Sequence, residues 1–308
     1  MNEHDDAPLL IHSLETVADL ILRAFDIAAP ARIVEIGSET GGFTLRMADW
    51  AREHGATLVS VDPDPAARLR EVSGEHLELV AAASPWALEG IEPGDAYVVD
   101  GDHNHWTVLR ELRAAFGDRR PGPLVVLHDV AWPWNRRDAY YAPDRIPADA
   151  RHEHAYWVAV RPGDERTVES GFSGRGDWAI ALHEGGERNG VLTAVEDFMT
   201  ERQGLRLLRL PAVFGVGFLF AEDAPWAEAM TQHVGPLHEH PLLAALERNR
   251  LALYMRVLEL QDEGERRRRA VDRTIAELNA QVAALESENA ALRLAAAEAH
   301  DGGAPAAA

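Results

Sequence analysis

Two apolar runs of the sequence each end close to a carboxylate. Asp100 comes directly after the apolar residues 96–99, and Asp129 follows the apolar residues 124–127 after a single histidine. Carboxylate oxygens are the ligands that hard divalent cations prefer, and such a site leaves positions open for substrate oxygens. If the two runs form neighbouring strands, these residues predict a site for a divalent metal ion.

A glycine-containing loop follows an earlier apolar run. Glu35, Gly37 and Gly41 have the spacing Glu-x-Gly-x-x-x-Gly. A dinucleotide-binding loop needs the spacing G-x-G-x-x-G, so that the backbone can approach a pyrophosphate. Glu39 stands at the middle glycine position here, and its carboxylate would repel a pyrophosphate. The loop therefore disfavours NAD as a ligand.

Secondary-structure elements must position these residues. The sequence alternates short β-branched runs, typical of strands, with helical patterns. This alternation predicts a doubly wound α/β fold with a mostly parallel sheet of seven strands, whose ligands bind beyond the carboxyl ends of the strands. Residues 205–210 and 213–220, joined by Pro211 and Ala212, predict an antiparallel hairpin that closes the sheet. The other expected strands are 32–36, 57–61, 77–80, 96–99 and 124–127, and the expected helices are 13–27, 43–54, 65–72, 103–116 and 191–202.

The glycine loop, together with Asp62 at the end of the second strand, resembles motif I and the next acidic residue of class I S-adenosylmethionine-dependent methyltransferases. The resemblance covers roughly residues 13–221 and implies a Rossmann-like methyltransferase fold. It implies that Glu35 helps to hold the amino end of the cofactor and that Asp62 accepts hydrogen bonds from both ribose hydroxyls. The implied cofactor-binding residues are Glu35, Gly37, Ser38, Gly41, Asp62, Ser84 and Asp100.

The acidic residues after the fourth and fifth strands resemble the metal-dependent members of this family, which include the catechol, caffeoyl-coenzyme A and macrocin-type sugar O-methyltransferases and the cephalosporin-hydroxylase-like proteins. The resemblance implies Mg²⁺ or Mn²⁺ held by Asp100, His128 and Asp129, with His128 either as a ligand or as a group that orients the ligands. The catechol members use a lysine base, which this chain lacks. An imidazole is well matched to take a proton from a hydroxyl near neutral pH. His103 is therefore the expected general base, with Asp102 as the alternative.

The composition excludes several other kinds of chemistry. None of the 308 residues is Cys or Lys, and all 30 basic residues are Arg. The chain therefore has no disulfide, no thiolate nucleophile, no cysteine-ligated metal and no lysine Schiff base. Its formal net charge of -21 argues against nucleic acid and membrane partners, because those bind basic surfaces.

No targeting or membrane segment is visible in the sequence. Residues 1–8 are acidic and polar, and the apolar run 211–221 is much shorter than the roughly 20 residues that span a bilayer. We therefore expect a cytoplasmic protein.

Residues 130–190 break the alternation and are rich in aromatic residues and arginine, which predicts an insertion that forms a lid over the active site. Aromatic faces and guanidinium groups suit a polar, ring-shaped substrate such as a sugar. His105 is expected to lie at the surface. The expected substrate-contacting residues are Trp132, Trp134, Arg136, Tyr140 and Tyr141.

The pattern of apolar residues changes after residue 241. Residues 242–294 predict a helical segment that serves oligomerisation. Apolar residues alternate by three and four over residues 275–292, with Asn289 at an a position of the heptad, as in a short parallel dimeric coiled coil. Glu288 at g could reach Arg293 at e of a partner helix; a single solvated helix is the alternative. The expected domains are a methyltransferase domain over 1–241, this helical segment and a disordered tail over 295–308.

The expected function is that of an S-adenosylmethionine-dependent, divalent-metal-dependent O-methyltransferase. Its expected acceptor is a hydroxyl of a sugar or of a glycosylated or polyhydroxylated small molecule, and it is expected to form a homodimer or a higher homo-oligomer. One alternative is a metal-independent methyltransferase of the same fold, in which His103 and His128 act as acid–base groups. The other is a non-catalytic scaffold of this fold that assembles through its coiled coil.

Overall fold

Five short apolar runs form the parallel part of a seven-stranded sheet with the order β3-β2-β1-β4-β5-β10-β9. The structure is a computed structural model that describes residues 12–301. Strands β4 and β5 are buried along their whole length, as expected for parallel strands covered on both faces. The predicted doubly wound fold is confirmed, and the bounds of the strands agree with the prediction: β1 (Arg32–Ile36), β2 (Thr57–Val61), β3 (Leu77–Val80), β4 (Ala96–Val99) and β5 (Leu124–Leu127).

The sheet is closed by the antiparallel strands β9 (Leu205–Leu210) and β10 (Val216–Ala221), which pair with each other and, through β10, with β5. The prediction of a hairpin is confirmed, but the prediction that its second strand begins at Val213 is wrong. Val213 and Phe214 have positive φ angles of 54° and 60°, which a strand cannot accommodate. These residues form a turn that contacts the end of β5 instead.

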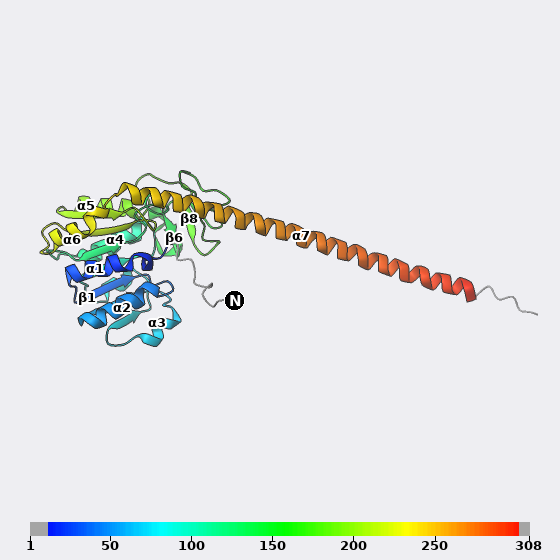
Figure 1. Ribbon diagram of the computed structural model, residues 1–308, viewed down its shortest axis with the longest axis horizontal. Coiled ribbons are helices and arrows are strands. Elements are labelled where there is room, and N and C mark those ends of the chain that lie inside the picture. Colours follow the sequence, from blue (N-terminus) through cyan, green and yellow to red (C-terminus); the bar gives the residue numbers. More distant parts are fainter. Residues whose placement is uncertain (1–11, 302–308) are drawn as a thin grey trace, which may run out of the picture. The chain divides into compact units, whose positions relative to one another are not determined.

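Helices cover the sheet, and Figure 1 shows them packed along its strands. Helix α1 contacts α2 and α6, whereas α4 packs on α5. Helix α4 begins at His105, not at His103 as predicted, because Asn104 caps it by accepting a hydrogen bond of 2.9 Å from the Thr107 amide. The helices are α1 (Ala18–Ala28), α2 (Gly42–His54), α3 (Ala67–Val72), α4 (His105–Phe116), α5 (Val191–Glu201) and α6 (Ala227–Val234).

The expected insertion, residues 130–190, contains a small sheet with the order β6-β8-β7. Its strands are β6 (Ala139–Tyr140), β7 (His154–Ala155) and β8 (Ala179–Ala181). Arg137 is fully buried beside this sheet, and its guanidinium donates to the carbonyl oxygens of Ala181, Asp164 and Glu165 at 2.8–3.0 Å. A buried guanidinium with these partners ties separate loops of the insertion together.

Helix α7 (Pro241–Asp301) spans the predicted helical segment and continues beyond residue 294, the expected end (Figure 1). The chain divides into two units, Met1–Met255 and Arg256–Ala308, so the first turns of α7 belong to the unit that contains the sheet. Of the predicted disordered tail, residues 302–308 lie outside the described residues. Within residues 12–301 no helix combines the length and the apolar run needed to cross a membrane.

Candidate active site

The sheet order brings the chemically promising residues to one edge. Strands β1, β4 and β5 are parallel neighbours, so the residues after their carboxyl ends share that edge. Asp100 follows β4 and Asp129 lies just beyond β5. His103 lies between Asp100 and the start of α4. The expected meeting of these two strand ends is therefore observed.

Asp100, His103 and Asp129 form a cluster in which one ligand atom of each lies within 4.8 Å of the others. His103 Nε2 lies 3.0 Å from Asp129 Oδ2 and 3.4 Å from Asp100 Oδ1. The other carboxylate oxygen of Asp129, Oδ1, is buried and has no hydrogen-bond partner among the described residues. Two carboxylates, an imidazole and one unsatisfied oxygen fit a divalent cation.

His128 lies next to this cluster. Its Nδ1 lies 2.9 Å from Asp100 Oδ1 and 3.3 Å from Asp129 Oδ2, and its Nε2 donates at 2.8 Å to the carbonyl oxygen of Val213. Burial alone would lower the pKa of His128, but the carboxylates of Asp100 and Asp129 outweigh it and raise the pKa well above its usual value. His128 Nδ1 thus lies as close to the two carboxylates as His103 Nε2 does, and it is hydrogen-bonded to Asp100.

The same charges act on the other members of the cluster. Burial raises the pKa of Asp100, but His128 and His103 outweigh this effect and hold it well below its usual value. Burial lowers the pKa of His103, but Asp129 and Asp100 reverse this and raise it. Without a bound cation the electrostatics therefore favour an ionised Asp100 beside protonated His103 and His128. A divalent ion would replace these protons as the positive charge.

Asp102, the alternative base, has hydrogen-bond contacts outside this cluster. Its Oδ1 accepts from the Tyr141 amide at 3.2 Å, and its Oδ2 lies 3.5 Å from the Thr107 hydroxyl. Burial raises the pKa of Asp102 to about 6. Asp102 can therefore exchange a proton near neutral pH, as a general base must.

The glycine loop brings its backbone close to neighbouring segments. Gly37 has a φ of 86°, and a Cβ atom there would lie 2.2 Å from the carbonyl oxygen of Asp100. Gly41 has a φ of 82°, and a Cβ atom there would lie 2.7 Å from the side chain of Leu69. Only glycine satisfies both the conformation and the space at these two positions.

Asp62 lies at one polar edge of a cavity, and Ser38 is its hydrogen-bond partner. The Ser38 amide and hydroxyl donate to Asp62 Oδ2 at 2.8 and 2.9 Å, and the Asp64 amide donates to Oδ1 at 2.8 Å. These bonds hold the Asp62 carboxylate in place after β2. The cavity, of about 270 Å³, is lined by Gly37, Asp62, Ser84, Asp100 and Asp102 among the predicted site residues, and by Tyr141.

Glu35 is more deeply enclosed than the predicted role suggests. Its Oε1 accepts from the Thr44 hydroxyl at 2.9 Å and its Oε2 from the Ser60 hydroxyl at 2.6 Å. Burial raises the pKa of Glu35 to about 8. Both carboxylate oxygens thus have partners inside the fold, although Glu35 also lines a small cavity beside Gly37.

Ser84 lines the cavity and donates its hydroxyl to Glu111 of α4. Glu111 is fully buried, and burial raises its pKa to about 7. The sequence prediction did not include Glu111, because its position on a helix gives no sign of the loop that it contacts. The prediction also missed Trp86, Arg145 and Ile146, which line the cavity from segments distant in sequence.

Of the five expected substrate residues, Tyr141 lines this cavity. Trp132 and Trp134 pack on Phe172, with ring centroids 6.0 and 5.8 Å apart. Arg136 forms a two-pronged ion pair with Glu196 at 2.5 and 2.8 Å.

Tyr140 and His105 belong to a buried network of the insertion. Tyr140 is fully buried and donates its hydroxyl to Asp138 at 2.8 Å. The expectation that His105 lies at the surface is wrong. Its amide donates to Asp138 at 2.8 Å and its Nε2 pairs with Asp197 at 2.8 Å, which fixes it at the start of α4.

Comparison with known proteins places a family match over the same region. Residues 34–130 match the model of a methyltransferase domain family. A search of curated proteins gave no match.

Several solved structures are similar to parts of the chain. A methyltransferase from Podospora anserina bound to S-adenosylhomocysteine is 16% identical, with a TM-score of 0.41, over 67% of this chain and 78% of that one. An O-methyltransferase from Bacillus cereus in complex with S-adenosylhomocysteine is 13% identical, with a TM-score of 0.40, over 71% and 84%. The O-methyltransferase TomG from Streptomyces achromogenes is 15% identical, with a TM-score of 0.41, over 67% and 79%.

The family match covers β1, β2, β3, β4 and β5, which are the strands that deliver the residues of the site. The sheet has seven strands and is mostly parallel, as the sequence predicted. The residues that match a methyltransferase-domain family are thus those that form most of the parallel part of the sheet.

Proposed function

We propose that this protein is an S-adenosylmethionine-dependent O-methyltransferase that uses a divalent metal ion. The observation that carries the proposal is the contact between the two parts of the site. Asp100 belongs to the Asp–His–Asp cluster and also lines the cavity that Gly37 and Asp62 border. A cofactor in this cavity and a cation on this cluster would therefore meet at Asp100.

The cavity residues suit S-adenosylmethionine as a cofactor. Asp62 offers carboxylate oxygens to the ribose hydroxyls, and the missing side chain at Gly37 leaves the backbone accessible. Glu35, Ser38, Gly41 and Ser84 complete the proposed set, with Glu35 supporting the loop from within through Thr44 and Ser60. When bound, the cofactor supplies an electrophilic methyl group on a sulfonium.

Asp100 and Asp129 are the proposed ligands of Mg²⁺ or Mn²⁺. His103 lies close enough to be the third ligand, and His128 supports Asp100 from behind. When bound, the metal supplies Lewis-acid chemistry that lowers the pKa of an acceptor hydroxyl. The residues themselves set where that hydroxyl lies, because Asp100 and Asp129 come from two neighbouring strands.

His103 is the proposed general base, with Asp102 as the alternative. Methyl transfer to an acceptor hydroxyl would release the proton of that hydroxyl, and His103 would take it up. Asp129 Oδ2, which lies 3.0 Å from His103 Nε2, would stabilise the imidazolium that this proton creates. If His103 instead binds the metal through the same nitrogen, Asp102 takes the proton, for which its pKa of about 6 is suitable.

The proposed acceptor is a hydroxyl of a sugar or of a glycosylated or polyhydroxylated small molecule. Four carboxylates, Glu39, Asp62, Asp100 and Asp102, line the cavity, and Arg145 is the one basic residue among its lining residues. Carboxylates accept hydrogen bonds from hydroxyls and repel anionic acceptors. This surface therefore supports a neutral, hydroxyl-rich acceptor.

The test is a methyl-transfer assay on a panel of glycosides with metal removed by chelation and then restored. The proposal expects transfer that stops on chelation, returns with Mg²⁺ or Mn²⁺ and is absent in Asp129→Ala. Transfer that survives both chelation and Asp129→Ala would select the metal-independent alternative. A folded protein that transfers no methyl group and binds no cofactor would select the scaffold.

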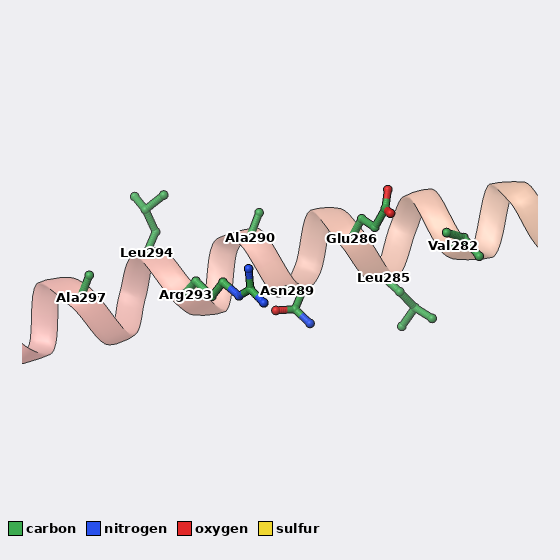
Figure 2. Close-up of a pocket in the computed structure, with 8 residues that line it drawn as sticks. All are labelled: Val282, Leu285, Glu286, Asn289, Ala290, Arg293, Leu294 and Ala297. Carbon is green, nitrogen blue, oxygen red and sulfur yellow. The ribbon is translucent and has the colours of Figure 1, made fainter.

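We also propose that α7 pairs with a second copy of this chain over residues 275–292. Its a and d side chains are exposed by 49–64%, among them Ile275, Leu278, Val282, Leu285 and Leu292. Figure 2 shows Leu285 and Asn289 on one side of the helix and Ala290 and Leu294 on the other. In a parallel pair, Glu288 at g would face Arg293 at e of the partner, so charge complementarity favours a copy in register.

A further inference from the structure

Residues 213–215, called here the site turn, connect β9 to β10 and lie against the candidate metal site. All three have positive φ angles, 54° at Val213, 60° at Phe214 and 92° at Gly215. Positive φ at a β-branched residue and at a phenylalanine is strained, so the surroundings must hold this turn in place. Strain of this kind is often found where a protein positions functional groups.

The carbonyl groups of the site turn accept hydrogen bonds from residues on both sides of Asp129. Val213 accepts the hydrogen bond from His128 Nε2 at 2.8 Å. Phe214 accepts from the Ala131 amide at 2.8 Å, and Gly215 accepts from the Val130 amide at 3.3 Å. Asp129, which itself has a φ of 59°, lies between these anchored residues. The position of its carboxylate therefore depends on the position of the site turn.

An amide group of the site turn is held from the opposite direction by helix α7. Glu247 Oε1 accepts from the Phe214 amide at 3.1 Å. Arg250 pairs with both oxygens of Glu247 at 2.7 and 2.6 Å and lies 5.1 Å from the centre of the Phe214 ring. Glu247 is only 8% exposed, so this carboxylate is an internal part of the fold.

We propose that Glu247 is a positioning residue of the metal site, a role that rests on the proposed function of the cluster. Glu247 holds the amide of Phe214, and the carbonyl of the adjacent Val213 in turn fixes the His128 ring against Asp100. The first turns of α7 thus complete the site, in addition to any role of the later turns in pairing. Groups that orient metal ligands typically change metal affinity by roughly 10–100-fold when they are removed.

The test compares Glu247→Ala with Glu247→Gln and with a control on the same helix. Glu265→Ala removes an exposed ion pair with Arg269 and should change nothing. Mn²⁺ affinity is measured by titration calorimetry on the full chain, S-adenosylhomocysteine affinity in parallel, and the ring proton on His128 Nε2 by NMR. We expect Glu247→Ala to weaken Mn²⁺ binding roughly 10-fold or more, to leave cofactor affinity unchanged and to expose the His128 ring proton to exchange.

Glu247→Gln keeps an oxygen acceptor for the Phe214 amide but loses the ionic pairing with Arg250. It should restore protection of the His128 ring proton and most of the Mn²⁺ affinity, and it serves as the main variant if Glu247→Ala does not fold. Glutamine that fails to rescue either property in a folded protein would contradict the role as a hydrogen-bond acceptor. So would Mn²⁺ affinity in Glu247→Ala within about twofold of the unmodified chain together with a protected His128 ring proton.

The ring proton separates this inference from the proposed function. If the unmodified chain binds no Mn²⁺, the metal-dependent function fails. In that case, loss of ring-proton protection in Glu247→Ala still supports the positioning role of Glu247, and unchanged protection overturns it.

Discussion

The carboxyl edge of the sheet and the part of α7 beyond Met255 differ in which kinds of side chain they expose to solvent. At the sheet edge, charged groups are buried: Asp129 and His128 are 2% and 3% exposed. Along α7 beyond Met255, apolar groups are exposed: Leu285 and Leu292 are 63% and 64% accessible. Buried charge and exposed apolar surface both cost free energy, so each region indicates a missing counterpart. A cation and a cofactor suit the first region, and a second helix suits the second.

The largest expected effect tests the sheet edge. We expect His103→Gln to lower the rate of methyl transfer by roughly 10²–10⁴-fold, because it removes the imidazole that accepts the proton. Binding of S-adenosylhomocysteine should be unchanged, since His103 is not among the residues that line the cavity. Steady-state rates and titration calorimetry measure the two properties. The matched variant is Asp102→Asn, and a larger loss of rate in Asp102→Asn than in His103→Gln would assign the base to Asp102.

The second prediction tests the exposed helix. Leu285→Glu should abolish self-association at micromolar concentration, because it places a charge at a d position of the pairing face. Leu294→Glu is the matched control, since Leu294 is equally exposed at 66% but lies on the opposite side of the helix (Figure 2). Sedimentation equilibrium measures both. Self-association that is lost equally in the two variants, or in neither, would contradict the proposed face.

The third prediction concerns a buried carboxylate beside the site. The pKa of Glu35 is raised from 4.5 to about 8, so its contribution to stability is fully present below about pH 4.5 and is lost as the pH rises through about 8. Glu35→Gln should remove this dependence. Relative to the variant, the unmodified chain should lose several kcal/mol at most, since a tenfold change in proton affinity corresponds to about 1.4 kcal/mol.

Urea unfolding between pH 5 and pH 9, without metal or cofactor, measures this difference. Glu78→Gln is the control, because Glu78 lies on β3 with its side chain 53% exposed. Equal pH profiles for the Glu35→Gln variant and the unmodified chain would show that Glu35 is ionised throughout.

The smallest expected effect is that of deleting residues 256–308. The first unit extends to Met255 and keeps Glu247 on the site turn, so the shortened chain should bind S-adenosylhomocysteine and Mn²⁺ within about twofold of the full chain. Deletion from Pro241 onward removes Glu247 and should weaken Mn²⁺ binding. Calorimetry on the two truncations therefore locates the boundary between the two regions of α7. Equal Mn²⁺ affinity in the two truncated chains would contradict the role of Glu247 at the metal site.

The strands and the clustering of Asp100 with Asp129 could be predicted because they depend on local patterns. Short β-branched runs form parallel strands, and the residues after neighbouring strands share an edge. The role of His103 beside both carboxylates depends on Asn104, which caps α4 and leaves His103 outside the helix. That distinction between adjacent polar residues is not encoded in any periodicity.

The site turn and Glu247 could not be predicted because they depend on contacts between distant segments. Val213 has the residue type of a strand, yet it adopts a left-handed conformation in which its carbonyl oxygen accepts from His128. The aromatic type of Tyr140 predicts a contact with the substrate, but its hydroxyl is buried and donates to Asp138. Residue type indicates what a side chain can do, and tertiary contacts decide which of these roles is used.

The most direct test of the central claim is titration of the folded chain with S-adenosylhomocysteine, which requires no knowledge of the acceptor. We predict saturable binding with one site per chain, and its loss in Gly37→Val, whose side chain would collide with the backbone of Asp100. Asp129→Ala should retain this binding, because Asp129 does not line the cavity. A folded chain that shows no binding would contradict the assignment of the cavity to this cofactor and, with it, the proposed methyl transfer.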